Sequence, residues 1–216
     1  MHRQNFIALG LIVVVLTAIV SVSYAKGMGP FGLVGLGVRK ATSNEGIVSS
    51  DKVTNENSAP TAPEISSGTW INSGPLTLKG LRGRVVLVDF WTFACYNCRN
   101  TLPYVKQWQE RYGDKGLTIV GVHSPELDEE RNVDNVRREV AELGIKYPVV
   151  TDNDFTNWSA YKVEGWPTVF LLDKEGRIRW MHVGEGAYDE AEKTIQQLLA
   201  EPAKETGAKQ NAKAAQ

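Results

Sequence analysis

Apolar runs and helix-spaced apolar residues alternate along the middle of the chain. Continuous β-branched runs begin at Val85 and Leu117 and predict strands that are buried on both faces. The other predicted strands are 147–150, 167–172 and 178–183, and the predicted helices are 102–112, 129–143, 157–163 and 188–199. This order predicts an α/β fold whose sheet is covered by helices on both sides.

A short hairpin is expected before the first long strand. Two apolar stretches, 70–72 and 75–78, flank Ser73 and Gly74, which are common turn residues. The hairpin would lead directly into the strand that begins at Val85.

The two ends of the chain differ in character from this middle part. Residues 1–25 contain an uncharged run, Phe6–Tyr24, long enough to span a bilayer. We expect a membrane anchor there, or alternatively a signal peptide cleaved after Ala25, which follows Ser23 at the required spacing. Residues 26–63 have the composition of a flexible linker and 201–216 that of a disordered tail. A folded domain is therefore predicted over 64–200. We expect it on the extracytoplasmic side of the membrane, because a thiol pair on a single N-terminal span is more useful outside the reducing cytosol.

Charge and cysteine content narrow the class of protein. The 24 Lys and Arg residues are balanced by 25 Asp and Glu, and no basic stripe is interleaved with aromatics, so no nucleic-acid partner is expected. Cys95 and Cys98 are the only cysteines, which excludes a separate framework of structural disulfides.

These cysteines lie where a strand passes into a helix. Free N–H groups and the helix dipole at that junction favour an anion, and so a thiolate at Cys95. Two intervening residues place Cys98 about one helical turn away, close enough for a disulfide. The sequence therefore predicts a redox-active pair.

Three motifs in this order resemble the thioredoxin superfamily. They are Asp89-Phe90-Trp91, Cys95-Tyr96-Asn97-Cys98 and Gly165-Trp166-Pro167-Thr168. The lead-in at 76–84 and an insertion between 126 and 158 are similar to TlpA-like membrane-anchored thioredoxins, and 121–126 resembles the redoxin domain of DipZ-type proteins. The resemblance implies a thioredoxin fold, a central mixed β-sheet flanked by helices, here with an N-terminal hairpin and a helix–strand insertion.

The resemblance also implies roles for individual residues. Cys95 would attack a partner disulfide, Cys98 would resolve the mixed disulfide, and Asp89 would accept the Cys98 proton. A cis Pro167, with Trp166 and Tyr96, would contact the partner. The implied activity is thiol–disulfide exchange, in which the protein reduces disulfides of its protein clients in preference to forming them. The residues between the cysteines also set the reduction potential of the pair, and so the direction of electron flow. The protein needs no bound cofactor, but it needs a membrane or periplasmic redox partner for regeneration.

Three other functions fit parts of the pattern. A thiol peroxidase would use Cys95 with Thr92, which precedes it by three residues as in peroxiredoxins. A copper metallochaperone would use both cysteines with His123 or His182, although a strand-end His123 hydrogen-bonded to backbone is the simpler interpretation. A non-catalytic binding module on the same fold would need neither cysteine.

Overall fold

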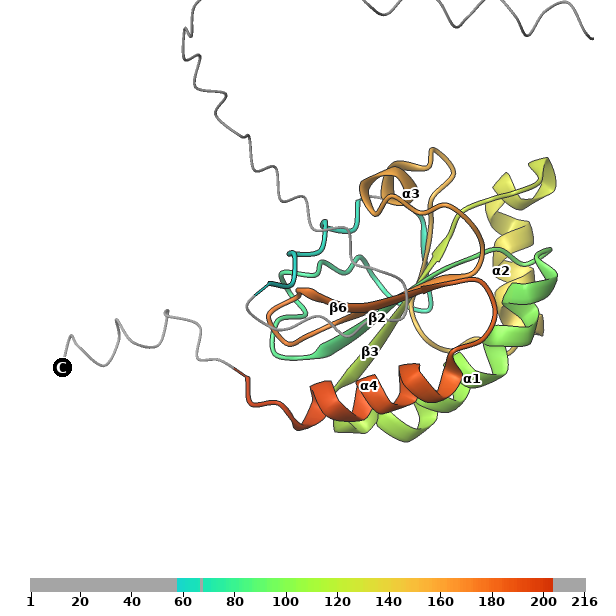
Figure 1. The fold of residues 1–216 in the computed structure, drawn as a ribbon. Coiled ribbons are helices and arrows are strands. Elements are labelled where there is room, and N and C mark those ends of the chain that lie inside the picture. Colours follow the sequence, from blue (N-terminus) through green and yellow to red (C-terminus); the bar gives the residue numbers. More distant parts are fainter. Residues whose placement is uncertain (1–57, 67, 204–216) are drawn as a thin grey trace, which may run out of the picture. The chain divides into compact units, whose positions relative to one another are not determined.

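One mixed sheet of six strands organises the part of the chain that the computed structural model describes, residues 58–66 and 68–203 (Figure 1). The strand order is β1-β4-β3-β2-β5-β6. β2, β3 and β4 are mutually parallel, whereas β1, β5 and β6 each pair antiparallel with their neighbours. The strands are β1 (Trp70–Ile71), β2 (Val85–Trp91), β3 (Leu117–His123), β4 (Val149–Thr151), β5 (Thr168–Leu172) and β6 (Ile178–Val183).

The described residues also form four α-helices and two short 3₁₀ helices, and the last helix follows the last strand. They are α1 (Tyr96–Tyr112), η1 (Gly113–Lys115), η2 (Asp128–Arg131), α2 (Val133–Glu142), α3 (Thr156–Ala160) and α4 (Tyr188–Ala200). The predicted helix over 129–143 is divided at Asn132, whose side chain accepts hydrogen bonds from the N–H groups of Asp134 and Asn135 and so starts α2. The prediction of a mixed sheet flanked by helices is confirmed.

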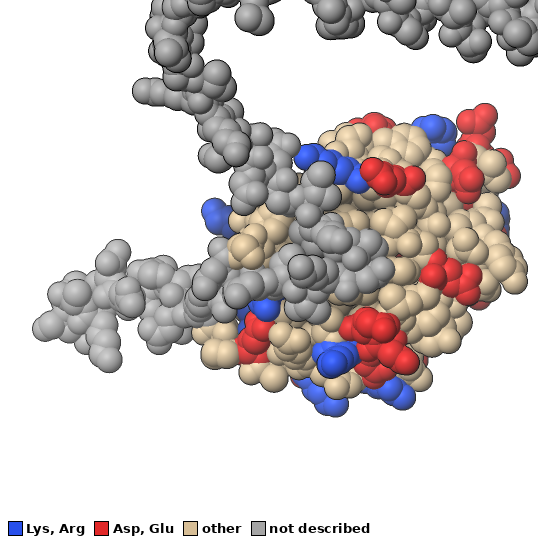
Figure 2. Space-filling view, viewed as in Figure 1, with Lys and Arg blue, Asp and Glu red and all other residues tan. Residues whose placement is uncertain are grey.

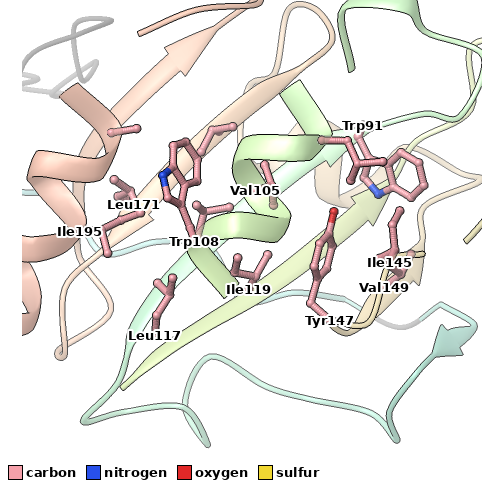
Figure 3. Close-up of a cluster of buried hydrophobic side chains, with 14 of the residues drawn as sticks. Trp91, Val105, Trp108, Leu117, Ile119, Ile145, Tyr147, Val149, Leu171 and Ile195 are labelled. Carbon is pink, nitrogen blue, oxygen red and sulfur yellow. The ribbon is translucent and has the colours of Figure 1, made fainter. Parts of the chain in front are cut away.

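Each strand contributes alternate side chains to two separate cores. In β2, Leu87 and Trp91 face the core beneath α1, α2 and α4, whereas Val88 and Phe90 face the core beneath α3. Figure 1 shows α1, α2 and α4 on one side of the sheet and α3 on the other. The first core, part of which Figure 3 shows, packs α1 and α4 directly against β2, β3 and β5.

The predicted hairpin over 70–78 is wrong. Trp70 and Ile71 form β1 but pair with Val150 and Val149 of β4, and residues 75–78 form no strand. Asn72 adopts a left-handed backbone (φ 65°), and its side-chain amide donates to two carbonyls in the segment before β4. The chain therefore turns away from β1 instead of folding back on it.

The ends of the described part contact β6 and its preceding turn. Ala62 N–H donates to the Gly176 carbonyl, and Ile178 N–H donates to the Pro60 carbonyl. At the other end, Glu201 accepts two hydrogen bonds from the buried Arg179 guanidinium. These contacts hold residues 60–62 and 201 against the folded domain.

The predicted anchor over 1–25, most of the predicted linker over 26–63 and nearly all of the predicted tail over 201–216 lie outside the described residues. Within the described part, no helix has both the length and the apolar character needed to cross a bilayer. On the face shown in Figure 2, Lys and Arg residues are interspersed with Asp and Glu.

Candidate active site

Cys95 occupies the N-cap position of α1, at the end of the loop that follows β2. Its backbone is extended (φ −68°, ψ 119°), and its Sγ accepts a hydrogen bond from the Cys98 N–H at 3.3 Å. The side chain is half-buried, and both thiols are free in this structure. An anionic sulfur at this position receives a backbone hydrogen bond and faces the positive end of the helix dipole.

Cys98 lies one turn into α1 and is buried. Burial raises the pKa of its thiol, as do the hydrogen bond with Cys95 and the nearby charges of Cys95 and Asp89. A hydrogen bond from the Thr92 backbone acts in the opposite direction but is outweighed. Cys98 therefore holds its proton until a nearby base removes it.

Asp89 lies beneath the cysteines because strand side chains alternate between faces. It shares the α1 side of β2 with Leu87 and Trp91. Its carboxyl is buried, and its Oδ1 has no hydrogen-bond partner among the described residues. Burial raises its pKa from 3.8 to about 7. A carboxyl with this pKa can take up or release a proton near neutral pH.

Pro167 lies at the same edge of the sheet as the cysteine loop. Its peptide bond to Trp166 is cis, as the family resemblance implies. Thr168 pairs with Phe90 in the antiparallel β5–β2 ladder, which places Pro167 level with Trp91. Trp166 is half-buried and its indole donates to the Ser124 carbonyl at 3.0 Å.

Tyr96, the third predicted contact residue, is 76% exposed at the start of α1. An aromatic side chain exposed to this degree beside Cys95 is available to a partner.

A buried carboxylate that the sequence analysis did not identify supports the cysteine loop. Glu130, in η2, is fully buried and accepts hydrogen bonds from the Thr92 hydroxyl and from Ala94 N–H (2.8 Å). It also accepts from the N–H groups of Glu126 (2.7 Å) and Leu127 (2.9 Å) in its own loop. Burial raises the pKa of Glu130, but these four hydrogen bonds outweigh it and the net pKa is lowered. An ionised Glu130 thus joins the insertion to the residue before Cys95.

His123 is buried beside this carboxylate at the end of β3. Its Nε2 lies 3.3 Å from the Thr92 hydroxyl oxygen, so this buried ring has a side-chain partner. Its ring stacks on Phe93. Burial lowers the pKa of His123 to about 4, against the opposing effect of the Glu130 charge, and the ring is therefore neutral at pH 7.

These contacts bear on two of the alternative functions. The Thr92 hydroxyl is buried and already donates to Glu130, so it is engaged away from any peroxide at Cys95. Among residues 58–66 and 68–203, no three His, Cys, Asp or Glu side chains lie close enough together to hold a metal ion. The copper hypothesis therefore lacks a third ligand in the described part.

Glu130 and a second residue, Tyr147, could not have been singled out from sequence alone. Glu130 is one of three consecutive acidic residues, which by pattern indicate a solvated loop. Tyr147 precedes β4 and reads as an ordinary core aromatic, yet its hydroxyl is buried near Asp89 and Cys98.

Comparisons with known proteins agree with this geometry. A profile of the Redoxin family matches residues 57–199. The DipZ proteins of Mycobacterium tuberculosis and Mycobacterium bovis are 41% identical over 154 residues, which cover 69% of this chain but 22% of theirs. YkuV of Bacillus subtilis, named a thiol-disulfide oxidoreductase, is 29% identical over 64% of this chain and 94% of its own.

Among solved structures, a thiol-disulfide isomerase from Corynebacterium glutamicum superimposes with a TM-score of 0.58. It is 26% identical and matches 65% of this chain and 98% of its own. The present chain spans about a fifth of the length of the DipZ proteins that it matches. Fold, site and family profile agree, and the chain belongs to the Redoxin family of thioredoxin-like proteins.

Proposed function

We propose that this protein is a thiol–disulfide oxidoreductase that reduces disulfides in partner proteins. One observation carries the proposal: a half-exposed Cys95 caps a helix, while Cys98, one turn later, is buried near the Asp89 carboxyl, whose Oδ1 has no partner among the described residues. Accessible and buried sulfurs in this order suit a nucleophile and a resolving thiol. The relatives YkuV and ResA, both named thiol-disulfide oxidoreductases, support the same activity.

The reaction takes two exchanges. The Cys95 thiolate attacks one sulfur of the partner disulfide, forming a mixed disulfide and releasing the partner's other sulfur as a thiolate. Asp89, in its ionised form, then takes the proton of the Cys98 thiol. The Cys98 thiolate attacks Cys95 Sγ, the bond from Cys95 to the partner breaks, and the second partner thiolate leaves. The partner gains two electrons and this protein ends with a Cys95–Cys98 disulfide.

Partner binding is assigned to the exposed edge around Cys95. The loop at the cis Pro167, together with Trp166 and the exposed Tyr96, would contact an extended client segment there. No cofactor is needed because the electrons are held by the cysteines themselves. The oxidised pair must be reduced again, and we assign this to a membrane or periplasmic redox partner.

The proposed location is the extracytoplasmic side of the cell membrane. The uncharged run Phe6–Tyr24 would anchor the domain, or would direct its export with cleavage near Ala25. A membrane-impermeant maleimide added to intact cells should label Cys95. Labelling only after the cells are broken would contradict this location.

A trapping experiment tests the mechanism. Full-length Cys98→Ser protein, mixed with insulin as a disulfide substrate, should accumulate a covalent adduct that dithiothreitol releases. Wild type should turn over instead, and Cys95→Ser should form no adduct. An adduct through Cys98 in the Cys95→Ser variant would reverse the assigned roles. Tyr161→Phe, a buried change whose hydroxyl bonds the Pro63 carbonyl, serves as the matched control.

The direction of electron flow follows from the reduction potential of the pair. Equilibration against dithiothreitol and glutathione buffers should give a value near that of thioredoxin, about −270 mV. A value near −120 mV, as in strong oxidants, would assign disulfide insertion instead.

A further inference from the structure

Three buried polar atoms without hydrogen-bond partners gather beside the resolving cysteine. Among the described residues, Asp89 Oδ1, Trp91 Nε1 and the Tyr147 hydroxyl all lack a partner. Buried polar atoms are normally paired, so a group of three calls for a physical reason. The proposed mechanism uses only Asp89.

Gly121 brings the three together. It pairs with Asp89 in the parallel β2–β3 ladder, on the face beneath α1. A Cβ at this position would lie 2.9 Å from Trp91 Nε1 and 3.1 Å from Tyr147 Cε2. Trp91 and Tyr147 therefore occupy the space that a side chain next to Asp89 would otherwise fill. Figure 3 shows the Tyr147 ring with its hydroxyl end toward Trp91.

Packing explains the Tyr147 ring but not its hydroxyl. The residue is 1% exposed, and a phenylalanine would fill the same space without burying an unpaired oxygen. Tyr161, another buried tyrosine, differs in this respect because its hydroxyl donates to the Pro63 carbonyl at 2.8 Å. A buried hydroxyl that stabilises nothing in its own surroundings indicates a role in the site that it faces.

We propose that Tyr147 is a positioning residue whose hydroxyl dipole favours the ionised form of Asp89, so that this carboxylate is ready to accept the Cys98 proton. The proposal rests on the thiol–disulfide exchange proposed above and adds a residue to its second step.

The electrostatics of the cluster require Tyr147 to act as a neutral dipole. Burial raises the pKa of its hydroxyl well above the ordinary value, and the charges of Asp89 and Cys98 raise it further. The hydroxyl thus keeps its hydrogen throughout the reaction. With no fixed partner, it is free to rotate and to turn that hydrogen toward the carboxylate.

The surroundings of Asp89 leave this role to few groups. The segment before β4 contributes Tyr147, and α1 contributes Cys98. The neighbouring strands place Gly121 and Val169 beside it in register, neither of which is charged. Two unpaired donors lie in this group, Trp91 Nε1 and the Tyr147 hydroxyl, and the hydroxyl is the one whose hydrogen can rotate toward the carboxylate.

In the resolving step, the Cys98 S–H bond breaks and its proton passes to the Asp89 carboxylate, which becomes a neutral carboxyl. The Cys98 thiolate forms the new bond to Cys95 as the partner thiolate leaves. Tyr147 transfers no proton and no electron. Its hydroxyl only sets the fraction of Asp89 that is ionised when the mixed disulfide forms.

The test is the pH dependence of resolution in full-length Tyr147→Phe protein. Reduced wild type and reduced Tyr147→Phe are each mixed with insulin in a single turnover. The decay of the mixed disulfide is followed by acid quenching at pH values from 5.5 to 9. The rate should rise with the ionisation of Asp89, and Tyr147→Phe should move the midpoint upward by about half a pH unit. Below the midpoint, the resolution rate of Tyr147→Phe should therefore be about threefold lower than that of wild type. Tyr161→Phe should leave the midpoint unchanged.

A double-mutant comparison separates positioning from a general structural effect. In an Asp89→Asn background, Tyr147→Phe should change neither the rate nor its pH dependence, because the group on which it acts is gone. An equal slowing with and without Asp89, or an unchanged midpoint in Tyr147→Phe alone, would overturn the proposal.

A direct titration keeps this proposal distinct from the proposed function. The Asp89 carboxyl carbon, assigned by its absence in Asp89→Asn, can be titrated by NMR in the reduced protein without any substrate. Tyr147→Phe should raise the Asp89 pKa, and a pKa that does not change refutes the positioning role even if exchange is fast. If wild type performs no exchange at all, the proposed function fails whatever the titration shows.

Discussion

The buried Asp89 carboxyl should make the folded protein less stable at neutral and alkaline pH than at acid pH. A carboxyl with a higher pKa in the folded than in the unfolded state binds its proton more tightly when folded. Its penalty is therefore absent below the unfolded pKa, grows as the pH rises between the two values and is complete above the folded one. For Asp89 these values are 3.8 and about 7.

The size of the effect follows from this interval. Each pKa unit corresponds to about 1.4 kcal/mol, so a shift of roughly three units costs about 4 kcal/mol once Asp89 is ionised in the folded protein. Because the carboxyl is 4% exposed, solvent screening reduces this little. Asp89→Asn removes the ionisation but keeps the shape. Between pH 4 and pH 8, the variant should therefore gain roughly 3–4 kcal/mol of stability relative to wild type.

Urea unfolding of both proteins in the reduced state, measured at pH 4, 6 and 8, gives this difference directly. Other titrating groups cancel because they are common to both proteins. Val88→Ala, on the opposite face of β2, is the matched control and should destabilise by the same amount at every pH. A difference between wild type and Asp89→Asn that stays constant with pH would refute the reasoning.

Four further substitutions test the surroundings of the site. Glu130→Gln should lower stability at pH 7 by about 3–5 kcal/mol in urea unfolding, since an amide cannot accept four hydrogen bonds. The wild-type carboxylate has a lowered pKa, so its stabilising effect is present at neutral pH and is lost when acid protonates it. The difference in stability between the two proteins should therefore shrink at low pH, and a difference that stays constant would contradict this account. Gly121→Ala should cost about 1–3 kcal/mol in thermal unfolding, because the new Cβ meets Trp91 Nε1 at 2.9 Å, and an unchanged Tm would show that the indole moves freely. Tyr161→Phe should lose about 1 kcal/mol in urea, whereas Tyr147→Phe should lose none at pH 4, where Asp89 is protonated in the folded protein; equal losses at that pH would show that the Tyr147 hydroxyl is paired.

The sequence was informative where local pattern and chemistry coincide. The apolar runs predicted the long strands β2 and β3, and the motif around Cys95 predicted the junction of strand and helix. The apolar spacing placed the start of the helix too late, at Leu102, whereas α1 begins at Tyr96. The cis bond before Pro167 was expected from the family resemblance and is present. In each case the relevant signal lies within a few consecutive residues.

Pairing between distant segments was harder to predict. The predicted hairpin after Trp70 is wrong because β1 pairs with β4, about 80 residues later. The sequence of a two-residue strand contains no signal that identifies its pairing partner. Glu130 and Tyr147 were missed for the same reason: each reaches the site from another part of the chain. Burial alone distinguishes such residues from ordinary loop and core positions.

The use of Cys95 as the N-cap of α1 links the chemistry of the pair to the integrity of the helix. The sulfur that accepts the Cys98 N–H is the same sulfur that would form the mixed disulfide in the proposed exchange. A thiolate is a strong acceptor, whereas a disulfide sulfur is uncharged and accepts weakly. Each cycle of the proposed exchange would therefore loosen and then restore the first turn of α1. The local stability of the first turn of α1 should therefore differ between the reduced and the oxidised pair, and so report the redox state.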